Sequence, residues 1–155
     1  MKTQGTVEQQ TVYATQDGAL IPLEDMPDKV FAEKMMGDGV CIIPTSPQVK
    51  CPINGTVKLV ADTLHAIGIV SDDGCELLIH IGIDTVKLKG NGFKVKVKTG
   101  DKVTVGDLLA TVDLDFIQSQ GLQTHTALIL TNGNKAIPNS FGQTKAGITP
   151  VFTYT

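Results

Sequence analysis

The chain has 155 residues, a formal net charge of −3 at pH 7, 41% hydrophobic residues and 19% charged residues. This size fits one domain with its own core, and we expect a flexible tail or linker remnant at residues 1–11 and a single domain at residues 12–155. The negative charge argues against a nucleic-acid-binding protein, and no segment has the roughly 18 consecutive apolar residues of a membrane span. Because the polar N-terminus lacks the apolar core of a signal peptide, we expect a cytoplasmic protein.

In chain order, the first predicted elements are a hairpin and a short helix. Residues 12–14 and 19–23 have strand composition and flank a turn at residues 16–18. Asp25 then resembles a helix cap, because a proline and a further acid follow it in the first turn. Gly37 is expected to end this helix.

The rest of the chain has mostly β patterns. We expect strands at residues 40–43, 56–60, 127–130, 136–137 and 151–154, and a second short helix at residues 113–120 with Asp113 as its cap. Three pairs of segments repeat each other, namely 14–18 with 51–55, 37–40 with 72–75, and 105–112 with 146–153. Two visible copies indicate duplicated β units rather than a solenoid. The predicted fold is therefore all-β, an antiparallel sandwich or barrel-like hybrid with internal duplication and one or two short helices.

Neither the cysteines nor the clustered lysines indicate a site of their own. Cys41, Cys51 and Cys75 are odd in number and lack a C-x-x-C spacing, so we expect small buried residues without a disulfide or zinc site. Six of the thirteen lysines lie at residues 87–102, but those at 94–98 alternate with valines. That alternation is typical of a half-buried strand with one solvated face.

The most unusual stretch is Gly74–Val86, where one histidine interrupts an apolar, β-branched run. With the period of two of a strand, one face carries Leu77, Ile79, Ile81 and Ile83, and the other carries Leu78, His80 and Gly82. A lone buried histidine is often only a core residue. However, Thr63–Ile69 repeats the design, with His65 followed by a glycine. Two such strands could pair and bring the two imidazoles together.

An imidazole pair of this kind suits phosphoryl transfer. Neutral imidazole is a nucleophile, and an ordinary pKa near 6.5 leaves most of it neutral at neutral pH. The N-phosphohistidine that forms is labile, so the group can be passed on again. Thr63 and His65 could donate hydrogen bonds to the phosphoryl oxygens, together with backbone amides near Gly82.

The same residues resemble a known family. Gly74–Val86 is similar to the phosphorylation-site pattern of the glucose-type enzyme IIA family of the bacterial sugar phosphotransferase system. Further matching segments are Val30–Lys34 with Gly37–Gly39, Thr63 with His65, and Gly90–Phe93. The resemblance extends from Val12 to Tyr154, which is almost the whole chain.

The resemblance implies a role for several individual residues. His80 is expected to be phosphorylated, and His65 to hydrogen-bond the phosphoryl group and assist its transfer, with Thr63 as a further donor. Asp84 and Asp28 match acids at the rim of the family's site. The apolar residues on which partner proteins dock are expected to be Phe31, Met35, Met36, Leu78 and Val86. For Phe31 and the two methionines, ordinary core packing is the alternative.

The implied function is a phosphotransferase that relays a phosphoryl group. The group would come from a phosphohistidine carrier protein, rest on His80, and pass to a cysteine of the IIB domain of a sugar permease. All thirteen basic residues are lysines, so the chain cannot supply a bidentate guanidinium clamp, and the carrier would bring the cation. The resemblance implies no cofactor and no required metal, and the unphosphorylated form would also bind and inhibit other sugar-uptake proteins.

The residues alone leave other functions open. His65, His80 and Asp84 could bind zinc in a hydrolase, although no HExxH motif is present. Val103–Leu109 resembles the turn of lipoyl and biotinyl carrier domains, which would favour a non-catalytic carrier or docking module, but it lacks a lysine in the usual position. His125 is expected to be a surface residue at the start of a strand.

Overall fold

The computed structural model describes residues 10–154 of the chain. It contains fourteen β-strands, two short α-helices and two 3₁₀ helices. In chain order the elements are β1 (Gln10–Tyr13), β2 (Gly18–Pro22), η1 (Leu23–Asp25), α1 (Lys29–Ala32), β3 (Asp38–Pro44), β4 (Gln48–Lys50), β5 (Gly55–Val60), β6 (Ala66–Ser71), β7 (Glu76–Ile81), η2 (Thr85–Leu88), β8 (Phe93–Val95), β9 (Lys102–Val103), β10 (Leu108–Val112), α2 (Leu114–Ser119), β11 (Thr126–Leu130), β12 (Ile137–Pro138), β13 (Gly142–Thr144) and β14 (Pro150–Tyr154).

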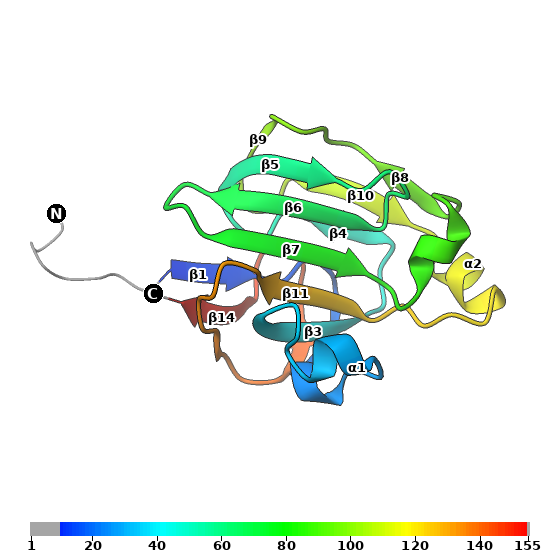
Figure 1. The fold of residues 1–155 in the computed structure, drawn as a ribbon, viewed down its shortest axis with the longest axis horizontal. Helices are drawn as coiled ribbons and strands as arrows, with labels where there is room; N and C mark the ends of the chain where they lie inside the picture. Colours follow the sequence, from blue (N-terminus) through cyan, green and yellow to red (C-terminus); the bar gives the residue numbers. More distant parts are fainter. Residues whose placement is uncertain (1–9, 155) are drawn as a thin grey trace, which may run out of the picture.

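The strands form three sheets, and every strand pair among the described residues is antiparallel. The large sheet has the order β13-β2-β3-β11-β7-β6-β5-β9, and the two small sheets have the orders β1-β14-β12 and β4-β10-β8. β5, β6, β7 and β11 run side by side across the molecule (Figure 1). The sheets do not close into a barrel, so the predicted antiparallel β-fold is confirmed in its sandwich form.

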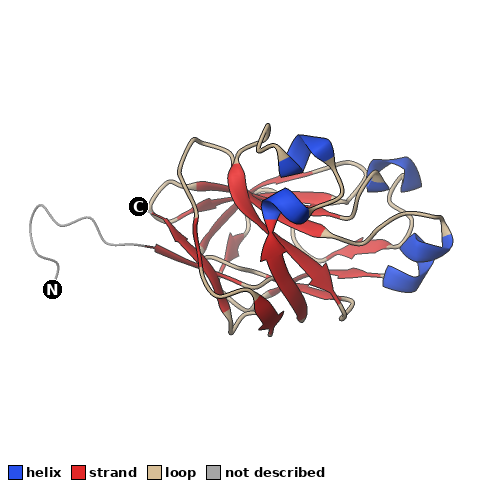
Figure 2. Ribbon diagram, turned by 90° about the horizontal axis from the view of Figure 1, so that it is seen from below, coloured by secondary structure: helices blue, strands red, loops and turns tan. Residues whose placement is uncertain are grey.

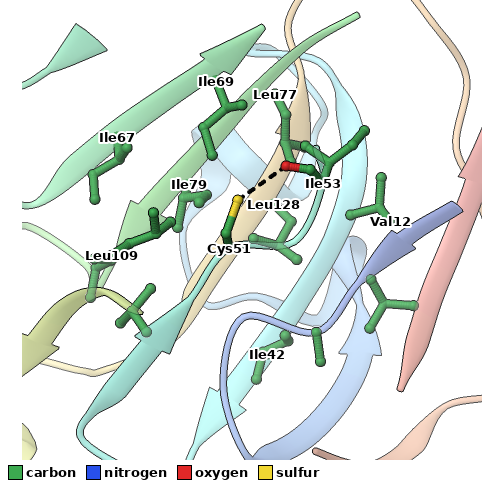
Figure 3. Close-up of a cluster of buried hydrophobic side chains, with 14 of the residues drawn as sticks. Val12, Ile42, Cys51, Ile53, Ile67, Ile69, Leu77, Ile79, Leu109 and Leu128 are labelled. Carbon is green, nitrogen blue, oxygen red and sulfur yellow. Dashed lines mark hydrogen bonds between the residues drawn. The ribbon is translucent and has the colours of Figure 1, made fainter. Parts of the chain in front are cut away.

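The main core lies between the sheets and is mostly aliphatic, with Phe93, Phe152 and Tyr154 as its buried aromatic residues. On β7, Leu77, Ile79 and Ile81 are at most 2% exposed and pack into this core. Figure 3 shows Leu77 and Ile79 with side chains from β6 and β11, and with Cys51, whose Sγ donates a hydrogen bond to the Ile53 carbonyl at 3.0 Å. All three cysteines are free and buried, as predicted.

The opposite face of the large sheet carries a second apolar cluster. It consists of Leu23, Met26, Phe31, Cys41, Ile83, Ala127 and Ile129, with Ile21 and Leu78 packed at its edge. The η1 and α1 segments supply the first three of these side chains, and the helical turns lie at the periphery of the β framework (Figure 2). The large sheet is thus apolar on both faces around its centre, and the histidines lie on the face of this second cluster.

Backbone hydrogen bonds bear out the predicted duplication. The Tyr13 amide donates to the Pro52 carbonyl at 2.9 Å, and the Lys50 amide donates to the Thr15 carbonyl at 2.7 Å. In the repeat of 14–18 in 51–55, residues 13 and 15 correspond to residues 50 and 52. Each of these two hydrogen bonds is therefore the counterpart of the other. The two segments therefore face each other across a local pseudo-twofold axis.

The repeat of residues 105–112 in residues 146–153 contacts the repeat of 14–18 in 51–55 through its glycines. The Gly106 amide donates to the Cys51 carbonyl at 2.9 Å, and the Gly147 amide donates to the Ala14 carbonyl at 2.8 Å. Residues 37–40 and residues 72–75 each lead into a strand, β3 and β7 respectively, and both of these strands pair with β11.

The predicted hairpin of residues 12–14 with 19–23 is wrong. β1 pairs with β14, starting from Gln10 opposite Tyr154, whereas β2 pairs with β3 and β13. Propensity gave the strands correctly, but their partners lie far away in the sequence. The predicted tail was too long by two residues, because Gln10 and Thr11 belong to β1; its other residues, 1–9, lie outside the described part of the chain.

The first helix is much shorter than predicted. Its cap is Asp28, whose carboxylate accepts a hydrogen bond from the Val30 amide at 2.9 Å, and not Asp25. Met26 precedes a proline and is extended, with ψ of 130°, as the proline ring disfavours helical backbone there. The chain therefore forms η1, a connection at residues 26–28 and then the four residues of α1.

The second helix and the lysine-rich strand follow the prediction more closely. α2 begins after Asp113, whose carboxylate accepts a hydrogen bond from the Phe116 amide at 3.0 Å. In the segment that contains β8, the lysines at 94, 96 and 98 are exposed, while Val95 and Val97 are half-buried against the main core. Among the described residues, no helix is long and apolar enough to cross a membrane.

Candidate functional site

His80 is the second-last residue of β7 and faces the second cluster. Alanines lie opposite it on both neighbouring strands, Ala66 on β6 and Ala127 on β11. Directly opposed residues on adjacent strands have Cβ atoms only about 5 Å apart, so two methyl groups leave room for the imidazole. The ring is half-buried, lies edge-on to the His65 ring at an interplanar angle of 83°, and is tilted by 51° against the Phe31 ring.

Gly82 ends the strand and redirects the chain. Its φ of +80° lies in the left-handed region, and a Cβ there would come within 2.3 Å of Thr85 Cγ2. Because of this turn, Ile83 packs into the second cluster. The prediction that Ile83 shares a face with Leu77 and Ile79 is therefore wrong, since strand alternation stops at the glycine.

His65 comes immediately before β6 and lies beside His80. Its carbonyl accepts a hydrogen bond from the Ile81 amide at 2.8 Å. The ring centroids of the two histidines are 5.0 Å apart, with an interplanar angle of 83°. Thr63 Oγ1 lies 2.7 Å from His65 Nδ1. The predicted meeting of the two imidazoles, with Thr63 as a third polar group, is confirmed.

Burial keeps both imidazoles neutral. Burial, together with the neighbouring His65, lowers the pKa of His80 to about 4, although the Gly82 backbone and the carboxylates of Asp28 and Asp84 act to raise it. Burial also lowers the pKa of His65, which a hydrogen bond to the Thr63 backbone partly offsets. Each ring is therefore an uncharged nucleophile or donor at neutral pH.

The two predicted acids lie at the rim, near enough to act on His80 through their charge. Asp28 is half-buried and is held by its cap bond to Val30. Asp84 is exposed, with φ of +60°, at the start of η2. Neither carboxylate hydrogen-bonds an imidazole, so both influence His80 through space.

An apolar wall and an apolar rim surround the pair. The Phe31 ring centroid is 4.7 Å from that of His80, and Phe31 is only 6% exposed. Phe31 therefore belongs to the wall and not to an exposed docking collar, because α1 folds it over the second cluster. Leu78 is half-buried at the edge of that cluster. The other expected docking residues are exposed, namely Met35 (69%), Met36 (44%) and Val86 (51%).

His125 is not the surface residue that was expected. It does precede β11, but it is half-buried, its Nδ1 is buried without a hydrogen-bond partner, and burial lowers its pKa. Its carbonyl accepts a hydrogen bond from the Gly82 amide at 2.8 Å. Alternation along β11 places it on the face of Ala127 and so of His80. Extending that alternation backwards from residues 127–130 is the signal that would have found it.

The arrangement does not favour the alternative functions. In residues 10–154, no group of three or more His, Cys, Asp or Glu side chains is placed to hold a metal ion, so Asp84 does not complete a zinc site with the two histidines. The turn between β9 and β10 is closed by hydrogen bonds between Thr104 and Asp107. It contains no lysine that could be modified as in a carrier domain.

Comparisons with known proteins agree with this geometry. Residues 10–136 match the family described as phosphoenolpyruvate-dependent sugar phosphotransferase system, EIIA 1. The chain is 54% identical over 121 residues to the PTS system glucose-specific EIICBA component of Staphylococcus saprophyticus subsp. saprophyticus, a match that covers 78% of this chain and 18% of that protein. The chain thus spans about a fifth of the length of this curated relative.

A solved structure is similar over nearly its whole length. Glucose permease IIA from Mycoplasma capricolum superposes with a TM-score of 0.89 and 36% sequence identity, covering 95% of this chain and 96% of that one. The family match and this likeness extend well beyond the histidine pair, to most of the β framework. The chain therefore belongs to the EIIA 1 family of the phosphoenolpyruvate-dependent sugar phosphotransferase system, whose members transfer phosphoryl groups through histidine.

Proposed function

We propose that His80 accepts a phosphoryl group from a phosphohistidine carrier protein and passes it to a cysteine of the IIB domain of a sugar permease. The observation that carries this assignment is a neutral, half-buried imidazole with a second imidazole at 5.0 Å and in edge-on orientation. Neutral imidazole attacks phosphorus without a separate base. His65 is close enough to contact the transferred group.

Nε2 is the reacting atom of His80 in this proposal. Nδ1 is buried and has no hydrogen-bond partner, so an incoming group reaches the ring from the other nitrogen. We assign the ring proton to Nδ1, which leaves the Nε2 lone pair free. In the first step the donor N–P bond breaks while the Nε2–P bond forms, and in the second the Nε2–P bond breaks while a cysteine thiolate forms an S–P bond. Neither step requires His80 to gain or lose a proton.

His65 acts as a hydrogen-bond donor in both steps. Thr63 Oγ1 lies 2.7 Å from His65 Nδ1, and we assign the hydroxyl as donor to that nitrogen. The ring proton of His65 is then on Nε2, which can donate to a phosphoryl oxygen on His80. Charge spread over the three equatorial oxygens is stabilised by donors of this kind.

A protein partner fits this site better than a small molecule. Two hollows in the described surface, one lined by Phe93 and Asp113 and the other by Asp73 and Tyr154, contain neither histidine. The rim is apolar at Met35, Met36 and Val86 and acidic at Asp28 and Asp84. Since the chain has no arginine, we propose that the carrier protein brings the cation that neutralises the phosphoryl group.

We further propose a cytoplasmic location and a single phosphocarrier domain that includes the whole of β1. The relative from Staphylococcus is a fused EIICBA component, which supports transfer between domains of one system. Its name and that of the structural relative refer to glucose, and glucose is the sugar we would test first. Binding of the unphosphorylated form to other sugar-uptake proteins is a secondary proposal, supported by the same exposed rim.

The test is phosphoryl transfer from phosphoenolpyruvate through enzyme I and the phosphocarrier protein, followed by intact mass. Wild type should gain one acid-labile phosphoryl group, His80→Ala should gain none, and His65→Ala should gain it but pass it on slowly. A control acceptor in the same tube shows that the donors are active. If wild type gains no phosphoryl group while the control does, the relay assignment is wrong.

A further inference from the structure

Leu64 has an unusual backbone conformation next to the histidine pair. Its φ is +63°, in the left-handed region that leucine rarely adopts. It lies between Thr63 and His65, the two residues joined by the contact of 2.7 Å. A bulky residue in this conformation needs surroundings that hold it there.

The loop explains why some residue must adopt this conformation. The Leu64 amide donates to the Ala61 carbonyl at 2.8 Å, and the Ala61 amide donates to the Ala66 carbonyl at 2.9 Å. Residues 62–65 thus form a four-residue loop at the tip of the β5–β6 hairpin, built around the turn that the Leu64 amide closes. A residue with positive φ in such a turn is usually glycine. Here the reversal at residue 64 returns the chain toward His80 and folds Thr63 onto the His65 ring.

The leucine side chain makes packing contacts that a glycine at this position could not make. It is half-buried and packs against the main core. It also covers Gly90, since a Cβ built at Gly90 would lie 3.6 Å from Leu64 Cδ1 and 3.8 Å from Leu64 Cγ. Packing on both sides fixes the direction of the loop, whereas a glycine would leave Thr63 and His65 free to swing.

We propose that Leu64 is a positioning residue for phosphoryl transfer. Its packed side chain holds a left-handed backbone, and that backbone sets the Thr63 hydroxyl against His65 Nδ1, so that His65 Nε2 carries the proton that contacts the phosphoryl group. The proposal rests on the relay function proposed above. Leu64 itself touches no reacting atom.

Leu64→Gly and Leu64→Met test this role. Glycine accepts the backbone conformation but removes the packing, whereas methionine has a similar volume and keeps it. We expect Leu64→Gly to take up one phosphoryl group on His80 but to pass it on about ten- to a hundredfold more slowly, the size of effect that a small misplacement produces. Leu64→Met should transfer at close to the wild-type rate.

Nitrogen-15 NMR of the His65 ring gives a readout that does not depend on the relay. In wild type and Leu64→Met, Nδ1 should have the shift of an unprotonated nitrogen, and in Leu64→Gly the two ring nitrogens should move toward averaged tautomers. Val95→Ala is the matched control, because Val95 packs against the same core from β8. It should lower the melting temperature without changing the His65 shifts or the transfer rate.

Three results would overturn the proposal. These are unchanged His65 shifts in Leu64→Gly, unchanged onward transfer by that variant, or equal slowing by Val95→Ala. A wild-type protein that takes up no phosphoryl group would instead contradict the relay function, and the ring shifts would still decide whether Leu64 positions His65.

Discussion

His80 is a base that its surroundings keep unprotonated. Burial and the neighbouring His65 lower its pKa to about 4, so the nucleophilic form persists well into acid. We expect the carbon-bound ring protons of His80 to titrate with a midpoint near 4 in NMR, and those of His65 and His125 to titrate below 6.5. A His80 midpoint at the ordinary value would contradict the burial of the ring as the cause of its neutrality.

The same shift links stability to pH. Between pH 6.5 and about 4, the unfolded chain binds a proton at residue 80 that the folded chain does not. The free energy of unfolding should therefore fall as the pH drops through this range, by about 3 kcal/mol from His80. Urea unfolding at several pH values measures it, with His80→Gln as the variant that should flatten the curve. Equal slopes in both proteins would contradict the assignment.

Gly82 directly follows β7 and turns the chain away two residues after His80. Only a residue without a side chain fits at position 82. Gly82→Ala should lower the free energy of unfolding by about 2–4 kcal/mol, from the left-handed backbone together with the contact to Thr85. Gly74→Ala is the matched control, because its φ is +90° but its Cβ would meet nothing within 4 Å. Denaturant unfolding should show a clearly smaller loss for Gly74→Ala. If the two losses are equal, the contact with Thr85 is unimportant.

At the scale of elements, the carboxylate that caps α1 also acts on the histidine site. Asp28 caps the helix at Val30 and raises the pKa of His80 by its charge. Asp28→Asn should keep the cap but lower the His80 pKa further, whereas Asp28→Ala should do the same and also cost about 1 kcal/mol of stability. Thermal unfolding and NMR titration of the two variants separate the effects. Equal melting temperatures would show that the cap contributes little.

Much of this fold could be predicted because alternation along a strand is a local property. The buried face of β7 and the exposed lysines around β8 follow directly from it. Pairing is not local, so the partner of β1 was missed: the backbone of residues 13–15 bonds to residues 50–52 rather than turning back. The length of α1 did not follow from the sequence, because Asp25 and Asp28 both fit a helix cap and only the extended Met26 before the proline decides between them.

The site was predictable where one residue type carries the chemistry. His80 and His65 share a pattern in the sequence, and pairing of β6 with β7 brings them together. The sequence could not show that Phe31 turns inward, since an apolar residue on a short helix fits core and surface equally well. Nor could it show the backbone of Leu64, because positive φ at a leucine has no signal in composition.

At the scale of the whole molecule, the last strand is held by its final aromatic residue. The Tyr154 hydroxyl donates to Asp73 Oδ1 at 2.9 Å and lies 3.3 Å from Ser71 Oγ, at the turn between β6 and β7. Tyr154 is 1% exposed, and burial raises its pKa. Tyr154→Phe should lower stability by about 1–2 kcal/mol and leave phosphoryl transfer unchanged.

Tyr13→Phe is the control for that change. Tyr13 lies on β1 of the same sheet, and in the described part of the chain its hydroxyl has no hydrogen bond. Its removal should change the melting temperature little. A slower relay in Tyr154→Phe would mean that the C-terminal strand communicates with the histidines, contrary to expectation.

The pairing of Gln10 with Tyr154 brings the first and last described residues together. They lie at one end of the molecule, whereas β7 runs toward the opposite end (Figure 1), and His80 lies near the end of that strand. A domain attached at either end would be tethered behind the reactive surface and would not cover it. Flexible linker length would then set how often an attached acceptor meets His80, through its effective concentration, and would leave the chemistry of each transfer unchanged.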